Sequence, residues 1–308
     1  MYKRVAILTA LVMTVAACSP GPGAGGTSGT GSSPATSPGT DGSPATSPGG
    51  DASPGATPTM VVVEGVSTPE SIQEVGTLTC GVKFDVVGFG FRNPTNSEIE
   101  GFDADICREI AAELGVEAEL IEAVSANRIP FLNERRVDLV ISTFTINDER
   151  REQIDFSRPY YIAGQSILAK ISDTSINGVG DLNAKRVCSA EGSTSEKNVR
   201  EQAPEAELVL FKTYTEAGQA LNDGRCDAVS TDDVILFGLI SAYPDTELKG
   251  EPFTTEEYGI GMKKGSAELK ALVDQVLADM ESDGRFAELW EANIGQYTDK
   301  EPELPPES

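Results

Sequence analysis

The segment TFTINDERREQIDFSRPYY, residues 143–161, places two hydroxyls and two arginines at a spacing that suits the binding of a carboxylate. Thr143 and Thr145 alternate around a phenylalanine, and the adjacent Arg150 and Arg151 begin five residues after the second threonine. A carboxylate is held best by an arginine that donates two parallel N–H bonds, supported by hydroxyl and backbone N–H donors. We therefore expect Arg150 and Thr145 to bind such a group.

An acidic residue in the second half of the chain supplies the complementary chemistry. Asp232 follows the apolar segment CDAVST, and a carboxylate with neutral oxygens around it suits an ammonium group. Asp232 with the hydroxyl or carbonyl of Thr143 would hold the amino group of an α-amino acid, whose carboxylate would face Arg150. The alternatives are that both threonines merely end a strand and that Asp232 is the N-cap of a helix in DVILFGLI.

The elements that must position these residues follow an alternating order of strand and helix. TLTCGVKF, EAELIEAV and VDLVIST read as strands, and GFDADICREIAAELG and ANRIPFLNER between them read as helices. In the longer helix Ile106, Ile110 and Leu114 recur every fourth residue, Asp103 can cap the start and Gly115 can end it. A second series runs through KRVCSA, AELVLFKTY and CDAVST. The order predicts an α/β protein with mostly parallel sheets flanked by helices.

Two short segments match each other. LNERRVDLVIST begins at Leu132 and LNDGRCDAVSTD begins at Leu221, with Leu, Asn, an acid, Arg, Asp and Val at the same relative positions. We interpret the match as a sign of two similar lobes. Ligands of open parallel sheets bind beyond the carboxyl ends of strands. Facing lobes would therefore bring Ser142 and Thr143 to one side of a cleft and Asp232 to the other.

The composition excludes several classes of function. Among 308 residues, 49 are acidic and 24 basic, which gives a formal net charge of −25, and there is no histidine. Such a surface repels nucleic acid, and catalysis or metal binding through histidine is impossible. We predict no cofactor and no metal site.

The N-terminus is typical of an exported protein. Lys3 and Arg4 precede a short apolar run that ends in VAAC at Cys18, which resembles the lipobox of bacterial lipoproteins. This predicts a signal peptide at residues 1–17 and a lipid on Cys18 at the extracytoplasmic face of the cell membrane; an ordinary signal peptide is the alternative. Repeats of SPATSPG make residues 18–60 a disordered tether, and we expect residues 299–308 to form a disordered acidic tail.

GFDADICREIAAELG and TFTINDERREQIDFSRPYY resemble the two signature stretches of family 3 extracellular solute-binding proteins, the polar amino acid receptors of ABC importers. The resemblance covers roughly residues 70–296. It implies the two-lobed, type II periplasmic-binding-protein-like fold, with a two-stranded hinge. Lobe 1 would comprise 70–162 plus 257–298, and lobe 2 would comprise 163–256. It also implies that Arg150 rather than Arg151 binds the ligand's carboxylate, and that Asp232, with Asp233 as a rival, binds its amino group.

The side-chain pocket follows from the same resemblance. GVKFDVVGFGFRNP and SANRIPFLNERRVD resemble the actinobacterial glutamate-binding lipoprotein branch, which implies that Lys83, Ser125 and Arg128 face a γ-carboxylate. A lysine at a sheet edge and an arginine on a helix surface are the alternatives. Val86 and Val87 depart from that branch, which keeps aspartate and glutamine open as ligands. The loop EGSTSEKN begins a helix, and the family uses this loop, here with Thr194, to contact the ligand.

Four cysteines besides Cys18 suggest disulfides outside the cell, and they allow three pairings. Cys188 leads into the Thr194 loop and Cys226 leads into the strand before Asp232, so a bridge between them would hold both ligand loops. We expect that pair, with Cys80–Cys107 left by default.

These observations predict a monomeric binding protein, not an enzyme, that captures an acidic amino acid, foremost L-glutamate, by closure of two lobes and presents it to an ABC transporter permease. Glutamine or aspartate is the alternative within the family. A cyclohexadienyl-dehydratase-like enzyme is the alternative outside it, and that chemistry needs a general acid or base in the cleft.

Overall fold

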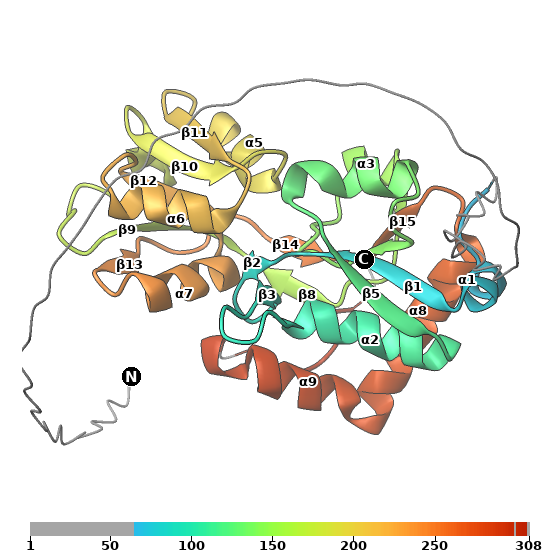
Figure 1. Cartoon of the computed structure of the whole chain (residues 1–308). Coiled ribbons are helices and arrows are strands. Elements are labelled where there is room, and N and C mark those ends of the chain that lie inside the picture. Colours follow the sequence, from blue (N-terminus) through green and yellow to red (C-terminus); the bar gives the residue numbers. More distant parts are fainter. Residues whose placement is uncertain (1–64, 299, 307–308) are drawn as a thin grey trace, which may run out of the picture. The chain divides into compact units, whose positions relative to one another are not determined.

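The computed structural model describes residues 65–298 and 300–306 (Figure 1). The predicted signal peptide, the lipid anchor at Cys18 and the tether lie outside the described residues. Within the described part of the chain, no helix is long and apolar enough to cross a membrane. The same residues contain no cluster of acidic or cysteine side chains that could hold a metal ion.

Lobe 1 is built on a mixed five-stranded sheet. Its strands, in order across the sheet, are β5 (Glu117–Glu122), β1 (Thr77–Val82), β6 (Leu139–Val140), β15 (Gly261–Lys263) and β7 (Ile154–Phe156). Only β15 runs antiparallel to its neighbours, so the other four strands share one direction. A small antiparallel sheet adds β2 (Asp85–Val86), β3 (Gly90–Arg92) and β4 (Ile99–Glu100).

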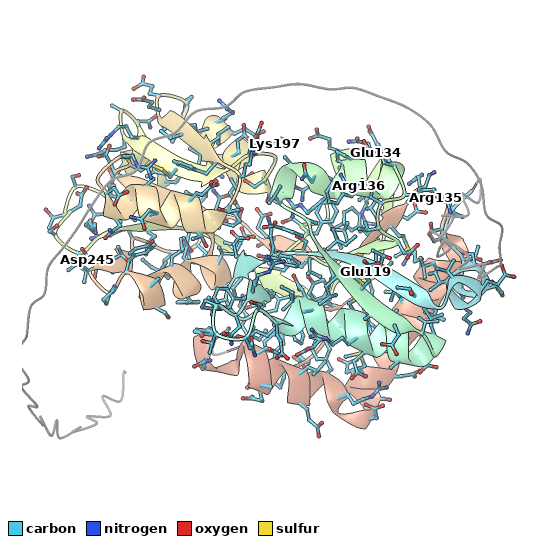
Figure 2. All side chains as sticks on the ribbon, in the orientation of Figure 1. Glu119, Glu134, Arg135, Arg136, Lys197 and Asp245 are labelled. Atoms are coloured by element: carbon cyan, nitrogen blue, oxygen red, sulfur yellow. A yellow bond between two sulfur atoms is a disulfide. The ribbon has the colours of Figure 1, made fainter. Side chains whose placement is uncertain are left out.

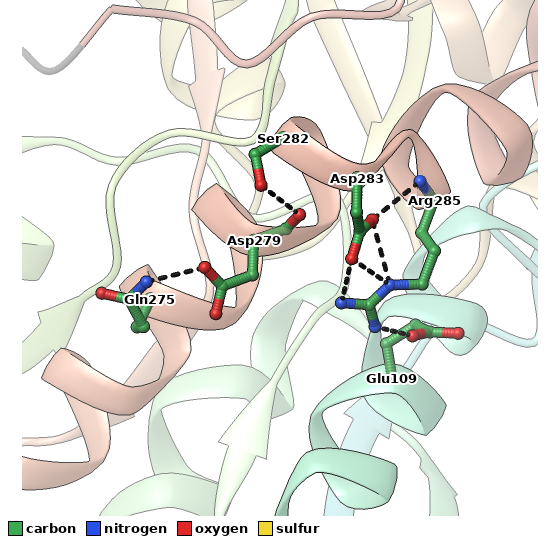
Figure 3. A network of polar contacts seen from close by, with 6 residues as sticks. All are labelled: Glu109, Gln275, Asp279, Ser282, Asp283 and Arg285. Atoms are coloured by element: carbon green, nitrogen blue, oxygen red, sulfur yellow. Dashed lines mark hydrogen bonds and ion pairs between the residues drawn. The ribbon is translucent and has the colours of Figure 1, made fainter.

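Helices cover both faces of this sheet, and Figure 1 shows α2 and α9 on the face opposite α3. The helical elements of lobe 1 are α1 (Pro69–Val75), α2 (Phe102–Leu114), η1 (Ser125–Asn127), α3 (Arg128–Asn133), α4 (Asp148–Arg151), α8 (Ala267–Asp283), α9 (Arg285–Asn293) and η3 (Gly295–Tyr297). A polar network fixes the corner between α8 and α9 (Figure 3): Arg285 donates to Asp283 and to Glu109, which lies on α2. The C-terminal helix is thereby tied to the helix that follows the first strands.

Lobe 2 repeats this design on a second five-stranded sheet. Its strands, in order, are β11 (Glu207–Phe211), β10 (Arg186–Ala190), β12 (Ala228–Asp232), β9 (Gln165–Lys170) and β13 (Thr246–Leu248). Its helical elements are η2 (Val179–Leu182), α5 (Thr194–Gln202), α6 (Tyr214–Asn222) and α7 (Asp233–Ala242). Here β9 is the antiparallel strand, again beside the central one.

Two antiparallel strands connect the lobes. β8 (Tyr161–Ala163) carries the chain out of lobe 1, and β14 (Glu256–Tyr258) pairs with it on the way back. The predicted α/β fold, with two mostly parallel sheets flanked by helices and a two-stranded hinge, is confirmed.

The matched sequence segments occupy equivalent places. β6 and β12 are each the third strand of their sheet. The aspartate before each strand makes the same contacts: the Asp138 carboxylate accepts the N–H of Thr79, and the Asp227 carboxylate accepts the N–H of Arg186. In both cases the aspartate's own N–H donates back to the carbonyl of that residue. The repeated Asp therefore pins the central strand to its parallel neighbour.

Both disulfides are present. Cys80–Cys107 joins β1 to α2, and Cys188–Cys226 joins β10 to the turn before β12. Each bridge links elements within one lobe, so the bridges leave the hinge free.

Three local expectations differ from the structure. Gly101 is the N-cap of α2, and Asp103 does not cap the helix because its side chain points to other partners. β6 ends at Val140, so the threonines lie in the turn beyond the strand. The expected disordered tail is partly packed: Leu304 is 7% exposed, and Arg158 donates to the carbonyl of Pro305. The burial of the apolar Leu304 side chain favours this packing.

The disulfide of lobe 2 yields a test. Replacing Cys188 and Cys226 together by alanine is expected to lower the free energy of unfolding by about 3–4 kcal/mol, because the bridge closes a loop of 38 residues. Urea denaturation of the oxidised protein and the double variant measures the difference. An unchanged midpoint would contradict it, and added reductant should no longer affect the lobe 2 transition of the variant.

Candidate functional site

The turn after β6 is held by hydrogen bonds on both sides of Thr143. Thr143 has φ +42°, a conformation that β-branched residues rarely adopt. Its N–H donates to the Asp103 carboxylate at 2.9 Å, and its carbonyl accepts from Arg128 at 2.9 Å. Arg128 takes one lone pair of the Thr143 carbonyl, so the second lone pair and the Thr143 hydroxyl are the acceptors left for the predicted contact with an ammonium group.

Arg128 lies inside the protein rather than on a helix surface, so the surface alternative is wrong. Its Nε and Nη1 donate to the carbonyls of Ser125 and Ser142 as well as Thr143. Its guanidinium lies 4.4 Å from the centroid of the Phe144 ring. Burial lowers the pKa of Arg128, although an arginine stays charged. Among the described residues, Nη2 has no hydrogen-bond partner, so its donors remain available to a ligand.

Arg150 and Arg151 are separated by burial. Arg150 is 7% exposed, whereas Arg151 is exposed. The Asn147 side chain caps α4 by accepting the N–H of Arg150, which turns the Arg150 side chain inward. Its guanidinium donates to the carbonyls of Thr145 at 2.5 Å and Gly192 at 3.5 Å. Burial, and then the charge of Arg128, lower the pKa of Arg150 to about 9. Arg150 is thus the arginine at the cleft.

Asp232 is the buried carboxylate of lobe 2 whose charge acts on Arg150 and raises its pKa. It stands at the N-cap position of α7, yet its side chain makes no capping bond, so the helix-cap alternative is wrong. Oδ2 accepts the hydroxyl of Tyr258 at 2.5 Å, and Oδ1 is buried without a partner among the described residues. Burial, and then the charge of Glu256, raise the pKa of Asp232 to about 7. The rival Asp233 is engaged elsewhere, because it accepts the N–H groups of Gly164 and Val234.

Lys83 and Ser125 form one buried contact. Lys83 is 1% exposed and donates to the Ser125 hydroxyl at 2.8 Å, so it is not an edge lysine. Its ammonium lies 5.4 Å from the centroid of the Tyr214 ring on lobe 2. Burial, and then the charge of Arg128, lower the pKa of Lys83 to about 7. Near neutral pH this lysine therefore holds its proton only part of the time.

The two lobes contact each other around these residues. The Thr194 hydroxyl, at the start of α5, lies 3.3 Å from the Thr145 hydroxyl. Gly192 has φ +75°, and a Cβ there would lie 2.8 Å from the Cα of Ala126, so only glycine permits this approach. Cavities of about 290 and 400 Å³ adjoin the contact, and both are lined by Arg150 and Gly192.

Two further contacts hold the lobes together at the rim. Asp85 accepts the backbone N–H of Tyr214, the first residue of α6, at 2.7 Å. Lys197 of α5, labelled in Figure 2, pairs with Glu149 of α4 at 3.1 Å.

Sequence reasoning missed four residues of the site. Asp103 was visible in GFDADICREIAAELG but was read as a cap. Phe144, whose ring contacts both guanidiniums, was visible between the two threonines. No sequence signal pointed to Tyr214 or Tyr258, because both reach the cleft only through the packing of lobe 2 and the hinge.

Charged groups of both lobes lie near each other where the lobes meet, and two paired strands connect the lobes, which is the arrangement of a two-lobed binding protein. Residues 78–296 match the bacterial extracellular solute-binding proteins, family 3, and the chain belongs to that family. It is a family of binding proteins rather than enzymes.

The chain is similar to two named bacterial binding proteins and to a solved structure. The ABC transporter glutamine-binding protein GlnH of Bacillus subtilis is 42% identical over 227 residues, which cover 72% of this chain and 83% of the relative. The glutamate-binding protein GluB of Corynebacterium glutamicum is 35% identical over 237 residues, covering 72% and 80%. A solved ancestral arginine-binding protein bound to glutamine is 37% identical with a TM-score of 0.69, covering 71% of this chain and 98% of that chain.

The buried lysine predicts a pH-dependent stability difference. The pKa of Lys83 is about 7 in the folded protein and 10.5 when unfolded, so between these values the unfolded state binds more protons. The cost of burying the charge is complete below pH 7 and disappears as the pH rises toward 10.5. Lys83→Met should therefore raise the free energy of unfolding of the ligand-free protein at pH 6, and this gain should shrink by pH 10.

Urea denaturation at pH 6, 8 and 10 measures that gain. The control is Lys212→Met, because Lys212 is exposed and should show no such trend. A Lys83 variant that is less stable than the wild type by the same amount at every pH would contradict the assignment.

Proposed function

We propose that this chain is the substrate-binding protein of an ABC amino acid importer, and that its ligand is glutamine. One observation carries the amino acid assignment. A buried guanidinium, Arg150, and a buried carboxylate oxygen without a partner among the described residues, Asp232 Oδ1, come from opposite lobes, and the charge of Asp232 raises the pKa of Arg150. A zwitterion satisfies both, and its binding would hold the lobes closed.

Each lobe adds one threonine to this proposed site, Thr145 from lobe 1 and Thr194 from lobe 2. Their hydroxyls lie 3.3 Å apart where the lobes meet, and Thr194 is the first residue of α5. The α-carboxylate would accept hydrogen bonds from Arg150 and the Thr145 hydroxyl, and it would lie near the positive end of the α5 dipole. The ammonium group would donate hydrogen bonds to Asp232 and to the Thr143 hydroxyl. Each ligand charge would thus be opposed within hydrogen-bonding reach.

The choice of glutamine rests on the far end of the pocket. Lys83 has a pKa of about 7, so it is partly neutral at neutral pH. Arg128 already donates three hydrogen bonds to backbone carbonyls. This end of the pocket is therefore less able to bind an anion than two fully available cations would be. A side-chain amide can accept from Arg128 and donate to a neutral Lys83 amine or to Ser125. Two relatives point the same way, because GlnH is named for glutamine and the solved ancestral protein is bound to it.

Glutamate is the second candidate, and it was the first expectation from the sequence. It is favoured by the proximity of Lys83 and Arg128, since the charge of Arg128 lowers the pKa of Lys83 and an anion between them would offset this repulsion. A γ-carboxylate would restore the proton on Lys83 and pair with both groups. The relative GluB is named for this ligand.

The lipid anchor, the tether and the delivery to a permease are part of the same proposal. A lipid on Cys18 would hold the protein at the extracytoplasmic face of the membrane, the tether of residues 18–60 would give it reach, and a closed monomer would deliver its ligand to the permease.

Replacing Arg150 tests the site. Arg150→Ala is expected to weaken amino acid binding by about 100-fold or more, because it leaves a buried carboxylate unpaired. Arg151→Ala is the matched control, since its side chain is adjacent in sequence but exposed, and it should bind like the wild type. Isothermal titration calorimetry on the purified chain measures both. Equal affinities of the two variants would contradict the assignment of the carboxylate to Arg150.

Proton linkage separates the two ligands. At pH 8 Lys83 is mostly neutral, so glutamate must add a proton to it, which costs about tenfold in affinity one pH unit above its pKa. Glutamine needs no proton on Lys83. We expect glutamine to bind more tightly than glutamate at pH 8, with a binding enthalpy that differs less between phosphate and Tris buffers than the enthalpy of glutamate does.

Glutamate should show an enthalpy that differs between these buffers, and Lys83→Met should abolish the difference. Tighter binding of glutamate with proton uptake would replace glutamine by the second candidate. Absence of binding to any polar amino acid would overturn the proposed function itself.

A further inference from the structure

Asp103 is a charged side chain that the binding of an amino acid, as described above, does not use. It lies in the first turn of α2 and is completely buried. Oδ2 accepts the N–H of Thr143 at 2.9 Å, and Oδ1 accepts the hydroxyl of Tyr160 at 2.7 Å. Burying a carboxylate is unfavourable unless its oxygens are satisfied and a cation is near, so this arrangement needs a reason.

The first consequence of these bonds is geometric. Thr143 is held at φ +42°, and this conformation directs its N–H toward α2 and its carbonyl toward Arg128. A threonine adopts it only when surrounding contacts impose it. Asp103 is the group that holds the N–H side of that residue, so it acts on Arg128 through Thr143.

The second consequence is electrostatic. Lys83 and Arg128 are the cations whose charges lower the pKa of Asp103, while burial raises it to about 6. Asp103 in turn raises the pKa of Lys83. At neutral pH its negative charge offsets part of the positive charge of Arg128 and of protonated Lys83, and it also favours that protonated form of Lys83. In the described part of the chain, no contact places Asp103 against the α-carboxylate end, where Arg150 lies.

We propose that Asp103 is a positioning residue that sets the selectivity of the cleft between neutral and acidic side chains. It holds the Thr143 carbonyl against Arg128 and supplies the counter-charge that makes the pocket fit an amide. The inference rests on the proposed amino acid site and concerns only the side-chain end of that site.

The test separates the effect of the Asp103 charge from the effect of its hydrogen bonds. In Asp103→Asn the amide oxygen can still accept from Thr143 and the amide nitrogen can donate to the Tyr160 oxygen, but the charge is gone. We expect the ratio of glutamate affinity to glutamine affinity, titrated at pH 8 where Lys83 is mostly neutral in both proteins, to rise by about tenfold, because the removed charge no longer repels a γ-carboxylate. A residue with only a structural role would weaken both ligands equally and leave the ratio unchanged.

Asp105→Asn is the matched control. Asp105 lies on the same helix turn, but it pairs with Arg108 and Asn293 on the outside of lobe 1, so its ratio should equal that of the wild type. Tyr160→Phe is a second variant that removes one donor to Asp103 while keeping the ring. It should shift the ratio of glutamate to glutamine affinity in the same direction as Asp103→Asn, by a smaller factor. It replaces Asp103→Asn as the test if that variant does not fold.

Calorimetric titration of each variant with both amino acids gives the ratios. A ratio for Asp103→Asn, or for Tyr160→Phe where that variant serves, equal to the wild-type ratio overturns the inference while the proposed function stands. A wild-type protein that binds neither ligand overturns the proposed function, and the inference with it.

Discussion

The burial of three cations in one cleft is the constraint on which the rest of this structure depends. Lys83, Arg128 and Arg150 are almost completely removed from solvent, and burial lowers the pKa of each of them. Such charges are tolerated only where carbonyls, carboxylates and aromatic rings replace the lost water. Here the carbonyls come from turns just beyond strand ends, the carboxylates come from α2 and β12, and the ring of Phe144 contacts two guanidiniums.

This constraint explains why the fold is repeated and split. The carboxyl ends of parallel strands leave a place where backbone carbonyls and loop side chains converge. One lobe supplies mainly cations, and the other supplies Asp232 and the start of α5. In the described part of the chain, β8 and β14 connect the lobes, and each disulfide stays within a lobe, so neither five-stranded sheet spans the connection. The hinge contributes to the chemistry as well, since Tyr258 of β14 donates to Asp232.

Much of the fold was predictable because its signals are local and periodic. The α2 pattern of Ile106, Ile110 and Leu114, ended by Gly115, gave the helix and its C-terminus correctly. The segments at Leu132 and Leu221 indicated two lobes, and the paired aspartates Asp138 and Asp227 show what the repeat does physically. The signals failed where a side chain had two possible partners. Asp103 is of a residue type that caps helices and lies near the start of α2, but Gly101 is the N-cap and the Asp103 carboxylate accepts a buried N–H from the turn after β6.

The sequence by itself determined the alternation of strands and helices, the absence of histidine chemistry and the set of polar residues from which a site could be made. These follow from periodicity and residue type, which need no knowledge of the fold. Only the tertiary structure decided which polar residues meet. It separated buried Arg150 from exposed Arg151, left one oxygen of Asp232 unpartnered among the described residues, and brought Tyr214 and Tyr258 to the cleft. The reason is that burial and pKa depend on neighbours distant in sequence, and the packing of two lobes chooses those neighbours.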